Sequence, residues 1–131
     1  MNFALLAAAP LMIQIHVAAA IGALALGAVQ LAAPKGRLPH RLMGWVWIGL
    51  MSATALSALF ITELNGDAFS LIHGLIPITL IGLTAAMLAV RRKNIRSHRS
   101  GMMWMFFAAL LIPGAMAMIP GRLMWSVLVG A

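Results

Sequence analysis

The chain has 131 residues, of which 63% are hydrophobic and only 8% are charged, and its net charge is +7. Soluble domains carry about 25% charged residues, so this sequence could not cover a water-facing surface. It contains no cysteine, which excludes disulfides, thiolate metal sites, iron–sulfur clusters and covalently attached haem. The length suffices for one domain with about four membrane spans of about 20 residues each.

The basic residues are concentrated in two places. Eight of the nine Lys and Arg residues lie in the short segments 35–41 and 91–99, each between hydrophobic runs. This distribution is typical of cytoplasmic loops in membrane proteins. It predicts contact with lipid head groups and gives no support for nucleic-acid binding. A signal peptide requires Lys or Arg before its apolar run, and none precedes the apolar N-terminal run here. We therefore expect that run to be retained as the first helix.

The predicted elements follow in chain order. Residues 1–10 are apolar and are expected to lie along the outer interface. Four hydrophobic segments follow, each long enough to cross a bilayer. A loop at 62–68 joins the second to the third and holds the only acids of the chain, Glu63 and Asp67. The apolar segment after Arg122 is too short to span again. The predicted spans cover about residues 11–33, 41–61, 69–90 and 101–119.

An even number of crossings with both basic loops inside places both termini outside. The tryptophans fit this topology. We predict Trp45, Trp47 and Trp104 near the inner interface and Trp125 near the outer one, as interfacial anchors.

An internal repeat is the most informative feature of the sequence. The pattern Lys-x4-His-Arg occurs twice, at 35–41 and 93–99. Another histidine lies 24 residues upstream of the first motif histidine, and one lies 25 residues upstream of the second, both inside hydrophobic segments. The chain therefore reads as two similar helical hairpins, about 11–61 and 69–119. The histidines are His16 and His40 in the first half and His73 and His98 in the second.

Both hairpins are expected to begin outside, so the duplication runs parallel about an axis along the membrane normal. His16 and His73 each lie 17 residues before the predicted inner end of their span, which is about 25 Å along a helix. His40 and His98 both lie at the inner boundary. The predicted fold is all-α: a single transmembrane domain, residues 1–131, forming a four-helix bundle of two parallel hairpins with its histidines in two layers.

Histidine inside a membrane span points to function, because a polar group there is costly. Haem b takes two axial ligands on opposite faces of its ring, and bundle cores supply them from facing helices. We therefore predict an outer haem held by His16 and His73 and an inner haem held by His40 and His98. Bis-histidine haem suits electron transfer, here across or within the membrane.

Arg41 and Arg99 directly follow the inner histidines. Guanidinium groups pair well with carboxylates, so both residues are candidates to bind haem propionates; fixing the topology is the alternative role. The sequence contains no nucleophile–base–acid set, phosphate-binding loop or His-Glu-x-x-His motif. We therefore assign no catalytic residue, and a membrane oxidoreductase of cytochrome b type stays an open possibility.

Residues 35–45, with the sequence KGRLPHRLMGW, together with His73 and the segment 97–99, resemble a family of uncharacterised four-helix bacterial membrane proteins, a domain of unknown function. The likeness covers nearly the whole chain. The four-helix, four-histidine plan is also similar to the di-haem cytochrome b superfamily, whose members pass electrons between ascorbate, quinol, superoxide or ferric iron and a partner across the membrane. This resemblance implies four histidine ligands to haem, the bacterial cytoplasmic membrane as location, and quinol or another redox partner. His40 and His98 depart from the superfamily because they lie at helix ends.

Two other functions compete with haem binding. Met-x-Met pairs at 103–105 and 116–118 could supply thioether ligands to copper(I) or another metal, together with imidazole. Methionine is also a common filler of apolar helices. The chain could instead be a non-catalytic assembly or structural protein of the membrane, with histidines as helix-packing groups.

Overall fold

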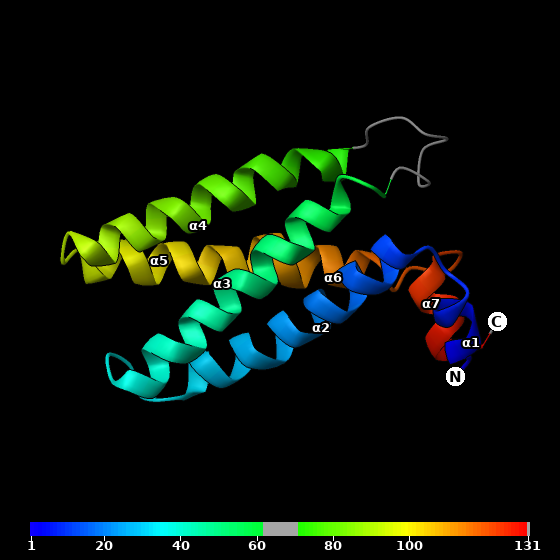
Figure 1. The fold of residues 1–131 in the computed structure, drawn as a ribbon, viewed down its shortest axis with the longest axis horizontal. Helices are drawn as coiled ribbons and strands as arrows, with labels where there is room; N and C mark the ends of the chain where they lie inside the picture. Colours follow the sequence, from blue (N-terminus) through cyan, green and yellow to red (C-terminus); the bar gives the residue numbers. More distant parts are fainter. Residues whose placement is uncertain (62–70, 131) are drawn as a thin grey trace.

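A computed structural model describes residues 1–61 and 71–130, and within these residues the fold is all-α, as predicted (Figure 1). The first half contains α1 (Phe3–Ala7), α2 (Leu11–Ala32) and α3 (Leu38–Ala58). The second half contains the short 3-10 helix η2 (Leu71–Gly74), α4 (Leu75–Arg91), α5 (Ile95–Phe106), the π-helical turn η3 (Phe107–Leu111), α6 (Ile112–Met116) and α7 (Leu123–Val129).

The long helices pack as two hairpins. α2 lies along α3, and α4 lies along α5 (Figure 1). The hairpins meet where α3 contacts α4 and where η3 contacts α2. Two helices, Leu11–Ala32 and Ile95–Met116, are long and apolar enough to cross a membrane, and α4 is a shorter apolar helix.

The connections differ from the predicted boundaries. α2 covers nearly all of the predicted span 11–33, but α3 begins at Leu38, before the predicted residue 41. Pro39 explains the early start, because its fixed φ and missing N–H suit the first helical turn. α5 also begins early, since the Asn94 side chain caps it by accepting from the Ser97 N–H at 3.1 Å. The predicted loop 91–100 is therefore only a tight turn. The predicted start of the third span, at residue 69, lies outside the described residues.

The fourth long helix changes geometry near Pro113. Residues Phe107–Leu111 form a π-helical turn directly before the α6 segment that contains this proline. Proline donates no N–H, and its ring crowds the preceding turn, so a wider turn relieves the clash. The helix ends at Met116, before the predicted residue 119.

The first and last helices, α1 and α7, lie together beside the start of α2 (Figure 1). α1 packs on α7, and the Asn2 N–H donates to the Val127 carbonyl at 2.6 Å. The Gln14 amide on α2 donates to the carbonyls of Ala7 and Ala9 at 3.1 and 2.8 Å, which holds α1 in place.

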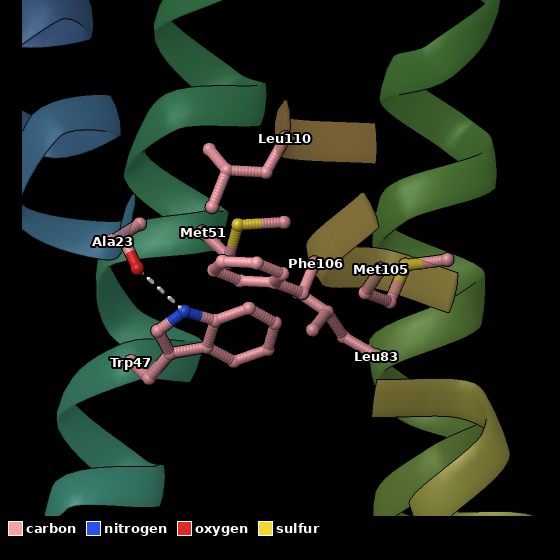
Figure 2. Packing of buried hydrophobic residues seen from close by; sticks show 7 residues of the cluster. All are labelled: Ala23, Trp47, Met51, Leu83, Met105, Phe106 and Leu110. Carbon is pink, nitrogen blue, oxygen red and sulfur yellow. Dashed lines mark hydrogen bonds between the residues drawn. The ribbon is translucent and has the colours of Figure 1, made fainter. Parts of the chain in front are cut away.

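The core fills the middle of the bundle, where residues from α2, α3, α4, α5 and η3 interdigitate (Figure 2). Gly27 permits the close approach of α2, because a Cβ there would lie 2.6 Å from the Phe106 ring and 2.8 Å from Trp47 Nε1. The buried members of the cluster are Ala23, Trp47, Met51, Leu83, Met105, Phe106 and Leu110.

Trp47 corrects the predicted aromatic belt. Its side chain is only 5% exposed, and its indole N–H donates to the Ala23 carbonyl at 2.9 Å (Figure 2). Trp45 and Trp104 are instead 57% and 67% exposed, as interfacial anchors require. Trp47 therefore joins α3 to α2 and is not an anchor in the interface.

Candidate functional site

His16 lies in the second turn of α2 and faces α3. Its Nδ1 lies 2.8 Å from the Thr54 carbonyl oxygen and 3.1 Å from Ser57 Oγ. The Ser57 hydroxyl itself donates to the Thr54 carbonyl at 3.0 Å, so its oxygen is left to accept. Because a carbonyl oxygen only accepts, the hydrogen of His16 is on Nδ1, and Nε2 carries a lone pair.

His98, on α5, has the same tautomer. Its Nδ1 lies 2.9 Å from the Ala86 carbonyl oxygen on α4. Each hairpin thus contains one histidine whose Nδ1–H donates to a backbone carbonyl of the other helix of that hairpin. This bond fixes the ring and directs the Nε2 lone pair away from it.

His40 is half-buried in the first turn of α3, outside the predicted span 41–61. Burial lowers its pKa below 6.5, and electrostatic interaction with Lys35 and with His98 lowers it further. His40 is therefore a neutral imidazole near pH 7. His98 thus acts on the pKa of His40, although the two residues belong to different hairpins.

His73 is half-buried in η2, the short helix that directly precedes α4. The predicted pairing of His16 with His73 involves α2 and the entrance to α4. These two helices begin toward the same end of the molecule, and α3 and α5 begin toward the other (Figure 1). The histidines therefore occupy two opposite ends of the bundle, separated by the core around Trp47.

Arg41 and Arg99 are both exposed, beside His40 and His98. The only acids of the chain, Glu63 and Asp67, lie outside the described residues. The two guanidinium groups are thus directed to the surface, where either a lipid phosphate or a carboxylate of a cofactor could meet them.

The members of the methionine pairs differ in burial. Met105 is buried in the core, whereas Met103 is exposed, so the two side chains have different environments. Met116 and Met118 are both exposed. Among the described residues, no three His or acidic side chains come together as metal ligands.

Two cavities in the described part of the chain lie away from the histidines. One, of about 280 Å³, lies between α4 and α5 and is lined by residues such as Gly82 and Trp104. Another, of about 480 Å³, lies beside α1 and α2 and is lined by residues such as Phe3 and Leu11. Neither has a histidine in its wall. Haem would need imidazoles with a free Nε2 lone pair, which the hydrogen bonds of His16 and His98 leave, and its propionates would need basic side chains such as those of Arg41 and Arg99.

Gln30, near the end of α2, was not among the residues predicted for the site. Its Nε2 donates to the His40 carbonyl at 2.9 Å, and its Oε1 is buried without a hydrogen-bond partner in the described part of the chain. The sequence feature that could have identified it is an amide side chain at the end of an otherwise apolar helix. A polar group in such a position is costly and therefore indicates a functional role.

Two apolar helices long enough to cross a membrane, joined to the rest of the chain by basic connections, are typical of a small helical membrane protein. The chain belongs to the family described as predicted membrane protein (DUF2306), which matches residues 13–128 and so includes every histidine. It matches no curated protein and no solved structure. The expected membership of a membrane family of unknown function is thus confirmed.

Proposed function

We propose that this protein binds haem b through its histidines and carries electrons across or within the bacterial cytoplasmic membrane. The observation that supports this most directly is the shared hydrogen bonding of His16 and His98. In each, Nδ1 is held by a backbone carbonyl, and Nε2 has the lone pair that an iron ligand needs. Histidines that ligate metals commonly donate their other ring N–H in this way.

In this proposal α2–α3 and α4–α5 are two parallel hairpins of a four-span bundle, with both termini outside. His40 and His98 share an inner haem, and His16 and His73 share an outer one. The arrangement is supported by the helix directions in Figure 1 and by the effect of His98 on the pKa of His40. Bound bis-histidine haem supplies one-electron exchange without an open coordination position. Arg41 and Arg99 bind propionates of the inner haem, the basic segments contact lipid head groups, and quinol or another redox partner exchanges the electrons.

The test is an absorption spectrum of the purified protein after expression with haem supplied. We expect a red protein whose reduced form shows the sharp bands of low-spin haem b. Metal analysis of the same sample should find iron without copper. A colourless protein under these conditions would refute the proposal, and stoichiometric copper would favour metal handling instead.

One observation favours a second candidate, a non-catalytic assembly or structural protein. The bonds of His16 to Thr54 and Ser57 tie α2 to α3 and would be useful to helix packing alone. In that case His16→Ala should destabilise the haem-free protein, and the spectrum of wild-type protein should show no haem.

A further inference from the structure

The end of α2 and the beginning of α3 are joined by one side chain. Gln30 Nε2 donates to the His40 carbonyl at 2.9 Å. Gly44 lies one turn further along α3, and a Cβ there would be 3.5 Å from the same nitrogen. The amide of Gln30 therefore lies against the first turns of α3, next to the backbone of the residue that bears the His40 imidazole.

Two polar atoms at this junction lack partners. Gln30 Oε1 and His40 Nδ1 are both buried, and neither makes a hydrogen bond to the described residues. Unpaired buried polar atoms are rare in proteins and costly to stability. The two atoms are chemically complementary, because an amide oxygen accepts and a ring nitrogen donates when it carries the hydrogen.

The hydrogen bonds of His16 and His98 indicate which kind of acceptor His40 Nδ1 lacks. His16 donates from Nδ1 to an oxygen of α3, and His98 donates from Nδ1 to an oxygen of α4. In both, the acceptor lies on the neighbouring helix of the same hairpin. For His40 the neighbouring helix is α2. The side chain that α2 places at the His40 backbone is that of Gln30, through Nε2, and its other amide atom is the unpaired oxygen Oε1.

We propose that Gln30 is the positioning residue for His40, a role that rests on the proposed haem function. Its Nε2 holds the His40 backbone, and its Oε1 accepts the Nδ1–H when His40 Nε2 binds iron. Gln30 thus fixes the ring orientation and tautomer of His40 and increases its strength as a ligand.

The experiment uses the full-length holoprotein with Gln30→Leu and Gln30→Glu. Leucine removes the acceptor, so we expect the inner haem to bind about 10- to 100-fold more weakly and to have a higher reduction potential. Glutamate loses the N–H that donates to the His40 carbonyl but keeps an acceptor oxygen and adds a negative charge, so the inner haem should remain and its potential should fall. Opposite shifts from the two variants are a signature that a merely structural role would not produce.

Gln14→Leu is the matched control, because within the described residues this glutamine bonds to Ala7 and Ala9, at the other end of the bundle. It should leave the inner haem unchanged. If wild-type protein binds two haems and both Gln30 variants keep its affinities and potentials, the role of Gln30 is wrong while the haem function stands. If Gln30→Leu does not fold, the Gln30→Glu potential alone decides: a fall supports the role, and no shift overturns it. Wild-type protein that binds no haem overturns both.

Discussion

The indole N–H of Trp47 donates to the carbonyl oxygen of Ala23 at 2.9 Å, and both residues lie in the buried core (Figure 2). This bond joins the two helices of the first hairpin at mid-length. The core around it fills the space between the two ends of the bundle where the histidines lie. A continuous cofactor channel through the middle is therefore absent from the described part of the bundle, and any electron transfer between the ends crosses packed side chains.

Trp47→Phe should destabilise the protein. The substitution removes the hydrogen bond and leaves a space in the packed core, which together cost about 1–3 kcal/mol. Thermal unfolding in detergent, followed by circular dichroism, measures the loss. Trp45→Phe is the control, since Trp45 is exposed and should change the unfolding temperature little. Equal effects of the two substitutions would contradict the core position of Trp47.

Gly27→Ala should also destabilise the bundle. The new methyl group would lie 2.6 Å from the Phe106 ring and 2.8 Å from Trp47 Nε1, so one of these rings must move. Overpacking of this kind costs about 1–3 kcal/mol. Gly49→Ala provides the comparison, because no atom lies within 4 Å of a Cβ there. That variant should be neutral or slightly stabilising, since alanine favours a helix over glycine. The same unfolding measurement applies, and a stabilised Gly27→Ala protein would show that α2 packs differently.

Hydropathy was sufficient to predict the all-α fold and the first long helix, because both depend on composition and length. The hydropathy prediction was wrong at the start of α5. It placed the charged residues Arg96 and Arg99 in a loop, but they lie in a helix that Asn94 caps. It also placed Trp47 at an interface, because hydropathy gives depth along a helix and not the face that a side chain occupies. The role of Gln30 depends on where two helices meet, and the histidine tautomers depend on which carbonyl each ring reaches. Neither can be derived from spacing alone.

The stability of the haem-free protein should depend on pH through His40. Burial, Lys35 and His98 lower the pKa of its imidazole in the folded state, so the unfolded chain takes up the proton more readily. The contribution of neutral His40 is therefore complete above about pH 6.5 and is lost as the pH falls through the lowered pKa. Unfolding midpoints measured from about pH 7.5 to about pH 5 should fall less steeply in His40→Gln than in wild type. Parallel curves would rule out a contribution from His40.

The most discriminating prediction concerns which histidines act together. Under the proposed function, His40→Ala and His98→Ala should each remove the inner haem, and the double variant should lose no more than either single one. His16→Ala and His73→Ala should each remove the outer haem in the same non-additive way, because a ring that loses either axial ligand is no longer bis-histidine. Haem content per protein and the potentials of the remaining haem distinguish the two pairs. Loss of the same haem from His16→Ala and His40→Ala would instead pair ligands within one hairpin. The parallel arrangement of the hairpins in the proposed function would then be wrong, because it places those two residues at opposite ends of the bundle.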